Sequence, residues 1–599
     1  MKVSDYIMQF ISSLGIDKVF CVTGGGAMHL NNSLGTCQNL EGVFMLHEQG
    51  AAIAAEAYAR VRDGYGCCLV TSGPGATNAL TGLVGAYIDS IPVIFISGQA
   101  KRADLVGDQH LRQFGIQEVD IISMVETYSK YAVQIQEPEE IRYELEKATS
   151  IAKEGRPGPV WLDVPLDIQA SQIDPNMIQT YLDVVDDNGD KYPVKDEDIT
   201  ETIRLLNKSK RPVLILGHGI RLAHAIPEMR ELYNKLGIPV LTSWNGVDLI
   251  EEEHPLYFGR PGSVGQRAAN LIQQSADFVL TIGTRLNLLS TGYNYDGFLA
   301  RANHVMVDID EHEMNKKSVH PQLKVVCDAG SFIKGFLDRV GEVNIDDKEK
   351  INSWIAKCTY LTEKYPVRCA EQQSQDGFVS TYDVVDTISD NMTSEDIYQF
   401  TSSGTSVDIA MKMLKIKWGQ RAFLTKGLAA MGYDVPACIG SCIGSGGKRT
   451  VCVTGDGSIA MNMQELEVIR RLNLPVKLFV TDNNGYSMIY QSQKGNFEGN
   501  LTGCIEESGL TLPDMNKIAT AFDIPNYRIN HREELDFVID KVLAMDGPIV
   551  CTVKSDISQQ VTPKQANYMR EDGQMASRPL EDMAPLLDRE ELMSALQNS

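Results

Sequence analysis

The sequence predicts an α/β fold in which three doubly wound domains each hold a parallel sheet. Two observations support this prediction. Short apolar runs typical of buried parallel strands alternate with longer amphipathic stretches from one end of the chain to the other. Polar, charged stretches interrupt this alternation twice and divide the chain into three blocks of similar size. Because a domain holds ~150 residues, the length of 599 residues also suggests three or four domains.

The first block covers residues 1–173. The stretch at residues 49–60 is rich in small residues and predicts a helix between two strands. The buried strands of this block are expected at residues 19–22, 68–70, 93–96 and 160–162.

Residues 174–198 are polar and acidic, and they predict a linker to the middle block at residues 199–342. Residues 343–381 form the second predicted linker, because this stretch opens with a charged run. The third block covers residues 382–554, and the tail at residues 555–599 is polar without a clear period. The apolar runs of the middle and third blocks lie at residues 213–219, 279–283, 305–308, 450–453, 476–480 and 549–553.

Charge and composition narrow the classes of function. A net charge of −24 argues against nucleic-acid binding, which needs a basic face, and against a role at a membrane surface. The most apolar stretch, residues 67–98, is broken by glycine and proline, and the chain shows no signal segment. We therefore expect a cytoplasmic protein with no nucleic-acid or membrane partner. The twelve cysteines form no Cys-x-x-Cys pair, so reduced core thiols are expected.

The clearest chemical signal lies where two successive predicted strands of the third block end. The first turn consists of Gly455, Asp456, Gly457 and Ser458, and the second turn contains Asn483. Neighbouring parallel strands end side by side, so Asp456 and Asn483 can share a hard cation such as Mg²⁺, and Gly485 can add a backbone carbonyl. A lone Gly-Asp-Gly is most often only a turn, but the pair of turns favours a metal site.

These turns resemble the metal-binding motif of enzymes that depend on thiamine diphosphate (ThDP), in which an Asn-Asn pair follows a Gly-Asp-Gly turn. Here the first Asn of the pair is replaced by Asp, and the following Gly-Tyr makes Asn483 rather than Asn484 the counterpart. The resemblance implies that Asp456, Asn483 and Gly485 bind Mg²⁺ on the cofactor diphosphate. It also places Tyr486 beside the cofactor.

The resemblance extends over essentially the whole chain, and the first block is similar to the pyrimidine-binding domain of the acetolactate-synthase-like branch. The matching segments are residues 22–27, 47–52, 72–78 and 155–160. In the family a glutamate shares a proton with N1′ of the aminopyrimidine, in a dry site that bends the cofactor into a V. The resemblance assigns this role to Glu48 and places Gln117 at the catalytic centre. Without the surrounding motifs, Glu48 would be interpreted only as a carboxylate that stabilises a helix N-terminus.

Further cofactor contacts follow from the same resemblance. In the first block they are Gly26, Pro74 and Asn78. In the third block Met431 matches the apolar side chain that supports the bent cofactor, and the backbone of Ala429 would meet the pyrimidine, although methionine is also a common core filler. The expected diphosphate contacts are Gly404, Thr405 and Ser406, where relatives often carry Gln-His or Gln-Asn.

The resemblance also implies a homo-oligomer. In the family, the glutamate-bearing domain of one subunit faces the metal-bearing domain of another, so the active sites lie at subunit interfaces. At least a homodimer is expected, and a homotetramer stays open.

Departures from true acetolactate synthases concern the second substrate, a 2-keto acid whose carboxylate is best bound by an Arg. The departures are Leu289 for that Arg, Ile116 for a Phe, Leu166 for a Lys and Ser492 for a Trp. Loss of one charge-assisted pair costs ~1.5–3 kcal/mol. The acceptor is therefore expected to be larger or uncharged, unless Arg260 or Arg267 replaces the missing Arg.

We expect an enzyme that decarboxylates a 2-keto acid, with pyruvate as the leading donor, and transfers the acyl carbanion to an aldehyde or ketone acceptor. Residues 24–32 and 577–583 resemble ThDP proteins encoded among surface-sugar pathways, which suggests a nucleotide-linked keto-sugar as acceptor. The alternatives are acetolactate synthase proper, a C–C lyase and a simple decarboxylase, the last disfavoured because His110 has no adjacent histidine. A non-catalytic regulatory subunit is disfavoured by the joint presence of Glu48, Asp456 and Asn483.

The sequence leaves FAD undecided as a second cofactor. The acetolactate-synthase branch places FAD, without redox work, in the middle domain. Residues 217–219 and 283–285 match that region in outline, but glycine turns after strands are expected in any such domain. The tail likewise either closes over the site or is disordered.

Overall fold

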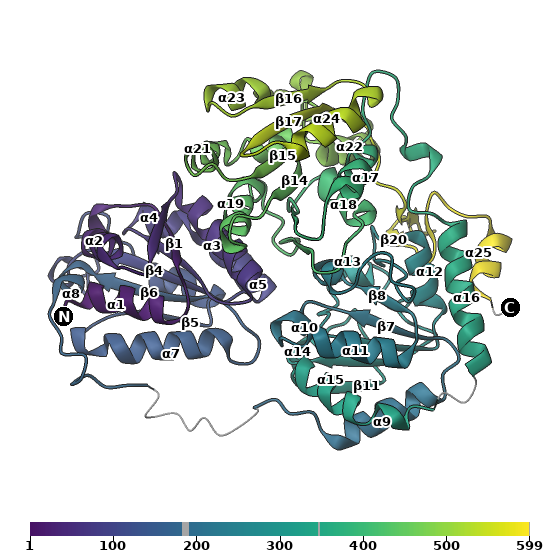
Figure 1. Cartoon of the computed structure of the whole chain (residues 1–599), viewed down its shortest axis with the longest axis horizontal. Coiled ribbons are helices and arrows are strands. Elements are labelled where there is room, and N and C mark those ends of the chain that lie inside the picture. The colour runs from purple at the N-terminus through teal and green to yellow at the C-terminus, as the bar shows by residue number, and fades with distance from the viewer. Residues whose placement is uncertain (182–190, 345–347, 598–599) are drawn as a thin grey trace.

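Three parallel sheets, each flanked by helices, confirm the predicted α/β architecture (Figure 1). The structure is a computed structural model and describes residues 1–181, 191–344 and 348–597. Residues 182–190 of the first predicted linker lie outside the described residues.

The first domain has a six-stranded sheet in the order β2-β1-β3-β4-β6-β5. Its strands are β1 Lys18–Cys21, β2 Glu41–Phe44, β3 Gly66–Val70, β4 Val93–Gln99, β5 Tyr131–Gln134 and β6 Val160–Pro165. Its longer helices are α1 Val3–Ser13, α2 Met28–Thr36, α3 Glu48–Arg62, α5 Leu80–Asp89 and α7 Ile141–Lys153. The sequence predicted the four central strands and missed β2 and β5. Those two strands lie at the sheet edges, where half-exposed side chains break the apolar run.

The middle domain has a five-stranded sheet in the order β11-β10-β9-β7-β8. Its strands are β7 Pro212–Leu216, β8 Val240–Thr242, β9 Phe278–Ile282, β10 Asn303–Asp308 and β11 Leu323–Val326. Its longer helices are α9 Asp196–Asn207, α11 Ile226–Leu236, α12 Arg267–Ser275 and α15 Ala329–Asp338. The next strand, β8, pairs on one side of β7 and the following strand, β9, pairs on its other side, which makes the carboxyl end of β7 a topological switch point.

The third domain has a six-stranded sheet in the order β13-β12-β14-β15-β17-β16. Its strands are β12 Ile397–Gln399, β13 Arg421–Phe423, β14 Thr450–Gly455, β15 Val476–Asp482, β16 Asn526–Ile529 and β17 Ile549–Lys554. Its longer helices are α17 Thr381–Asn391, α18 Thr405–Met413, α19 Asp434–Gly444, α22 Ser487–Asn496, α23 Met515–Ala521 and α24 Leu535–Ala544. The strands missed by the sequence, β12, β13 and β16, are only three or four residues long.

Helix α3 of the first domain packs against α19 of the third domain (Figure 1). The alanines of α3 are buried, and a Cβ added at Gly440 of α19 would lie 2.1 Å from the carbonyl oxygen of Ala54. Only glycine therefore permits this close approach of the two helices. The contact holds the two domains with expected cofactor motifs against each other within one chain.

The second predicted linker differs from the structure, because it contains helix α16 Lys348–Lys364. Trp354, Cys358 and Leu361 of α16 are buried in a core cluster of the middle domain, and the Trp354 indole donates to the carbonyl oxygen of Pro212 at 3.1 Å. This segment is therefore part of the middle-domain fold.

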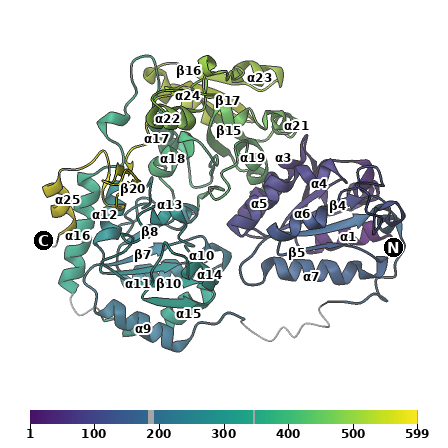
Figure 2. The ribbon, with the colours of Figure 1, turned by 180° about the vertical axis from the view of Figure 1, so that it is seen from behind.

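The tail is ordered and packs on the middle domain. It forms two small antiparallel ribbons and helix α25 Arg589–Leu596, which lies beside α16 in both views (Figures 1 and 2). The ribbons are β18 Lys564–Gln565 with β21 Met583–Ala584, and β19 Asn567–Met569 with β20 Met575–Ser577. Leu580, Met583 and Leu592 are buried, so a few irregularly spaced apolar anchors hold a polar segment in place.

Ten of the twelve cysteines are buried, so most of these thiols lie in the core of the fold. In the part of the chain that the structure describes, no helix is both long and apolar enough to cross a bilayer.

Candidate cofactor sites

The two turns predicted to hold a metal lie next to each other. Strands β14 and β15 pair in parallel up to Gly455 and Thr481, so Asp456 and Asn483 follow at the same sheet edge. The Asp456 Oδ2 atom accepts hydrogen bonds from the backbone N–H groups of Asn483 at 3.0 Å and Asn484 at 2.7 Å. The predicted neighbourhood of these two turns is therefore present in the fold.

Asp456 is a buried carboxyl group whose charged form a bound cation would stabilise. Its residue is 2 % exposed, and this burial raises the pKa of the carboxyl to about 7, against the lowering effect of three backbone N–H donors. No group of three or more His, Cys, Asp or Glu side chains is arranged to hold a metal among the described residues. One carboxylate with amide, carbonyl and phosphate oxygens is a donor set that suits Mg²⁺. The residues at this edge thus fit a metal ion carried on a diphosphate.

The segment at residues 404–406, which is expected to contact the diphosphate, lies at the same sheet edge. Gly404 has φ +87° and precedes α18, and a Cβ placed on it would meet nothing within 4 Å. The Thr405 and Ser406 hydroxyls lie 3.0 Å from the hydroxyls of Ser487 and Thr481, respectively. The open helix N-terminus can receive a diphosphate beside the Asp456 turn. Sequence reasoning missed Thr481 and Ser487, although both flank the recognised Asn483 turn.

Met431 packs over the Asp456 turn. A Cβ on Gly457 would lie 3.5 Å from the Met431 methyl and 2.4 Å from the Tyr486 ring, so glycine is required there. The Ser458 hydroxyl accepts the N–H of Gly432 at 3.1 Å. Ala429, with φ +58°, turns the chain into this segment. The structure thereby brings together the predicted contacts of the third domain.

The first-domain contacts gather around Glu48, which begins α3. Asn78 Nδ2 donates to Glu48 Oε2 at 3.0 Å, and Pro74 begins the short helix α4 Pro74–Asn78 that carries Asn78. The Ser72 hydroxyl lies 3.5 Å from Gln117 Oε1, and a Cβ on Gly26 would lie 2.3 Å from the same hydroxyl. Asn78 therefore contacts Glu48 directly, whereas Gly26 and Gln117 both lie next to Ser72.

The three predicted acceptor residues do not share one pocket within a chain. Ile116 is 91 % exposed on a first-domain loop. Leu289 lines a pocket in the middle domain, whereas Ser492 on α22 lines a different cavity. A single acceptor site built from all three would need a second subunit.

Neither basic residue proposed to replace the missing Arg is available for a substrate. The Arg260 guanidinium is buried, lies 3.1 Å from the Glu252 carboxylate and donates to the carbonyl oxygens of Lys412 and Leu414. Arg267 donates to the tail carbonyls of Met583 and Pro585. Arg260 thus connects the middle domain to the third domain, and Arg267 connects it to the tail.

The cavity at Ser492 has a volume of about 600 Å³. Middle-domain, third-domain and tail residues form its wall, and Thr405 of the expected diphosphate segment is among them. Lys494 and Lys564 also line it, and within the described residues neither forms an ion pair with a carboxylate. Lys494 and Lys564 bring two positive charges to this cavity, whose wall also contains Asp408, a carboxylate that pairs with Lys426 at 2.8 Å.

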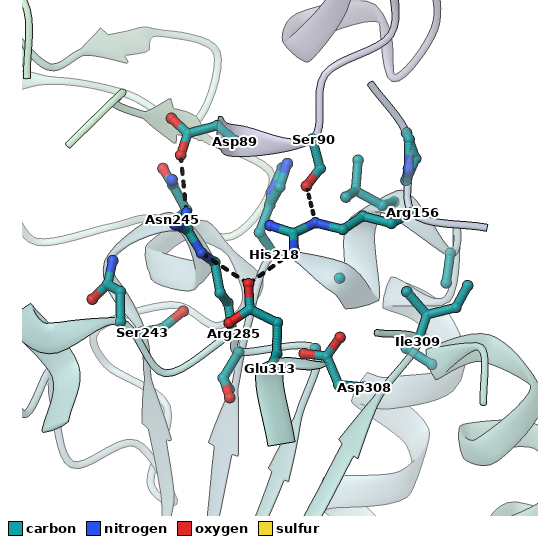
Figure 3. Close-up of a pocket in the computed structure, with 18 of the residues that line it drawn as sticks. Asp89, Ser90, Arg156, His218, Ser243, Asn245, Arg285, Asp308, Ile309 and Glu313 are labelled. Carbon is teal, nitrogen blue, oxygen red and sulfur yellow. Dashed lines mark hydrogen bonds and ion pairs between the residues drawn. The ribbon is translucent and has the colours of Figure 1, made fainter. Parts of the chain in front are cut away.

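A second cavity, of about 310 Å³, lies at the carboxyl ends of the middle-domain strands β7, β9 and β10 (Figure 3). Arg156 and Arg285 reach Glu313 from two sides, at 2.8 and 3.3 Å. Gly217 and Gly283, which lie in the segments that resemble an FAD site, are needed for packing. A Cβ on Gly217 would lie 2.1 Å from the carbonyl oxygen of Gly283. Both ring nitrogens of His218 are buried, and neither has a hydrogen-bond partner within residues 1–181, 191–344 and 348–597, so polar groups remain for a ligand.

Comparison with known proteins agrees with this division into domains. Residues 1–124 match the N-terminal TPP (thiamine pyrophosphate) binding domain of thiamine pyrophosphate enzymes. Residues 199–336 match the central domain, and residues 402–553 match the C-terminal TPP binding domain.

Similar proteins include three acetolactate synthases. The chain is 29 % identical over 565 residues to the large subunit of isozyme 2 from Escherichia coli (strain K12), covering 94 % of this chain and 97 % of that protein. It is 30 % identical over 571 residues to the chloroplastic acetolactate synthase 2 of Nicotiana tabacum, covering 94 % and 83 %. It is 31 % identical over 507 residues to the large subunit of Cyanidium caldarium, covering 84 % of each chain. The chain therefore belongs to the thiamine pyrophosphate enzyme family and is a ThDP-dependent enzyme of its acetolactate-synthase-like branch.

Proposed function

We propose that this enzyme decarboxylates pyruvate and joins the remaining acetyl unit to the carbonyl carbon of a nucleotide-linked keto-sugar. Carbon dioxide leaves the donor, a C–C bond forms to the acceptor carbonyl carbon, and the acceptor oxygen takes up a proton. Bound ThDP supplies the nucleophilic carbon for this chemistry. Asp456 and Asn483 would hold Mg²⁺ on its diphosphate, with a carbonyl from Gly485, and Glu48 would hold a proton at N1′ of its pyrimidine.

The observation that carries the choice of acceptor is the cavity at Ser492. Its volume of about 600 Å³ exceeds what a second pyruvate needs and suits a ligand of larger size. The ammonium groups of Lys494 and Lys564 face it without carboxylate partners among the described residues, and a lysine is a common binder of phosphate oxygens. A nucleoside diphosphate attached to the sugar would provide the matching negative charge.

The proposed function predicts pyruvate-dependent release of carbon dioxide that rises when the keto-sugar acceptor is added. The Lys494→Gln/Lys564→Gln double variant is expected to lower kcat/KM for the nucleotide-linked acceptor by about tenfold or more. For the same sugar without its nucleoside diphosphate, the wild type and the double variant should have equal kcat/KM. Lys541→Gln is the matched control. The Lys541 ammonium lies 4.9 Å from the centre of the Tyr527 ring, much as Lys494 lies 5.2 Å from that of Tyr490, but Lys541 is outside the cavity. Equal losses for both acceptors would contradict the role of the lysines.

Acetolactate formation is the second candidate, favoured by 29–31 % identity to acetolactate synthases over most of the chain. Incubation with pyruvate alone separates the two. Acetolactate as the main product at a rate equal to that with the sugar would overturn the sugar acceptor and leave the donor intact.

We further propose a homo-oligomer, at least a dimer, with active sites between subunits. Several large apolar side chains of the domain that carries Glu48 stay exposed in the single chain, as a buried interface would require. They are Met28, Leu46, Phe114 and Ile116.

For the middle-domain cavity we propose FAD, the cofactor implied by the resemblance to the acetolactate-synthase branch. The cavity lies at the topological switch point, and it is lined by His218, whose ring nitrogens have no hydrogen-bond partner in the described part of the chain. The purified protein is expected to show visible flavin absorbance, and denaturation should release about one flavin per chain. A colourless protein that takes up no added FAD, seen by fluorescence quenching, would contradict this assignment.

A further inference from the structure

The segment that follows the metal-binding turn reaches back to the domain that carries Glu48. After the short helix α20 Asp456–Ile459, the chain turns at Asn462 and enters η8 Met463–Glu465. Asn462 and Glu465 are buried, although both are polar. Both side chains accept a hydrogen bond from the neighbouring Gln464, and both also bond to the loop at residues 46–49 of the first domain. A buried polar group needs such partners, so these contacts fix where the two segments lie relative to each other.

Glu465 holds the backbone just before Glu48. Its two carboxylate oxygens accept the N–H of Leu46 at 3.1 and 3.3 Å. A Cβ added at Gly50 would lie 2.6 Å from Glu465 Oε1, so the first turn of α3 is pressed against this carboxylate. His47 then caps α3 by accepting the N–H of Gln49 at 3.1 Å. The entry into the helix that presents Glu48 is thus fixed from the third domain.

Asn462 holds the residue just after Glu48. Its Nδ2 group donates to the side-chain oxygen of Gln49 at 2.9 Å and to the carbonyl oxygen of Gly432 at 2.7 Å. Gly432 directly follows Met431, which packs over the Asp456 turn. One amide therefore ties the Glu48 loop to the segment expected to support the bent cofactor.

We propose that Glu465 and Asn462 are positioning residues through which the diphosphate-binding domain of each chain orients Glu48 of the same chain. This inference rests on the proposed role of Glu48. In the proposed dimer, Glu48 and Asp456 of one chain belong to two different active sites. Residues 456–465 then link the metal-binding turn of one site to the activating glutamate of the other.

The test compares turnover with cofactor binding. Glu465→Ala removes both acceptors of the Leu46 N–H, and a misplacement of about 1 Å at a catalytic group can cost ~10²-fold in rate. We expect kcat to fall by about 10–100-fold, while the ThDP dissociation constant at saturating Mg²⁺ changes by less than about threefold, because the diphosphate and metal contacts remain. Glu465→Gln keeps one acceptor oxygen and should restore most of kcat. Near-ultraviolet circular dichroism of the ThDP-bound protein should show an altered pyrimidine signal in Glu465→Ala.

Glu467→Gln is the matched control, since Glu467 lies two residues further on and its carboxylate pairs with Arg470 of the same helix, with Glu467 30 % and Arg470 40 % exposed. If Glu465→Ala does not fold, the near-isosteric variant Asn462→Asp carries the same comparison, because its carboxylate cannot donate to the Gln49 side-chain oxygen. A kcat of Glu465→Ala or Asn462→Asp equal to that of Glu467→Gln overturns the inference, as does a ThDP affinity that falls in proportion to kcat. Unchanged turnover in Glu48→Gln would instead overturn the proposed role of Glu48, so the two failures are distinguishable.

Discussion

Glu48→Gln is expected to lower turnover by about 10²–10⁴-fold, the usual contribution of a positioned acid or base, while ThDP still binds. The amide keeps nearly the same shape and can still accept the hydrogen bond that Asn78 Nδ2 donates at 3.0 Å. It has no carboxyl proton to share with the pyrimidine nitrogen. The loss should therefore appear in kcat, with little change in the KM for pyruvate.

The measurement is steady-state release of carbon dioxide together with calorimetric titration of ThDP. Glu41→Gln serves as the matched control, because Glu41 is an exposed carboxylate of the same domain that pairs with Lys18. Turnover within threefold of wild type in Glu48→Gln would show that another group performs this proton transfer.

The central strands of all three sheets could be predicted because burial on both faces leaves an uninterrupted apolar run. Edge strands carry mixed faces, and three-residue strands such as β12 and β13 are too short to show a period. Helix α16 could have been found, since Trp354, Cys358 and Leu361 recur at helical spacing. The charges at its start concealed that signal.

The metal turn was predictable for a topological reason: successive parallel strands that pair must end at one edge, which brings Asp456 to Asn483. Asn462 and Glu465 follow the same turn but gave no signal, because their partners, Gln49 and Leu46, lie over 400 positions earlier in the chain. Only the packing of α3 on α19 brings these segments together.

The acceptor site was the least predictable part. The resemblance predicts one acceptor site that contains Ile116, Leu289 and Ser492. Within a chain, however, these residues lie on a loop and in two separate cavities. Patterns along one chain report local structure, so they cannot show how residues from several domains and two subunits meet in one site. The cavity at Ser492 could not be predicted either, because Lys564 and other parts of its wall belong to the tail, whose position the sequence leaves undecided.

Asp456→Ala should abolish turnover and weaken ThDP binding by at least about 100-fold at fixed Mg²⁺, since loss of even an indirect metal contact costs 10–100-fold. The Asp456 carboxylate joins the two turns, because its Oδ2 atom accepts the Asn483 and Asn484 N–H groups. Titration of ThDP at several Mg²⁺ concentrations measures the effect. Asp523→Ala, at an exposed turn of the same domain, is the control.

Mixing the two inactive variants then tests where the sites lie. If Glu48 of one subunit serves the Asp456 turn of another, a hybrid dimer of Glu48→Gln and Asp456→Ala chains contains one site with both native residues and one site with neither. Random reassortment of equal amounts should restore about a quarter of wild-type activity, because half of the dimers are hybrids with one intact site out of two. If each chain instead used its own Glu48 and Asp456, every site in the mixture would lack one residue. The mixture would then stay inactive, and the active site would have to be formed within one chain, across the contact between α3 and α19.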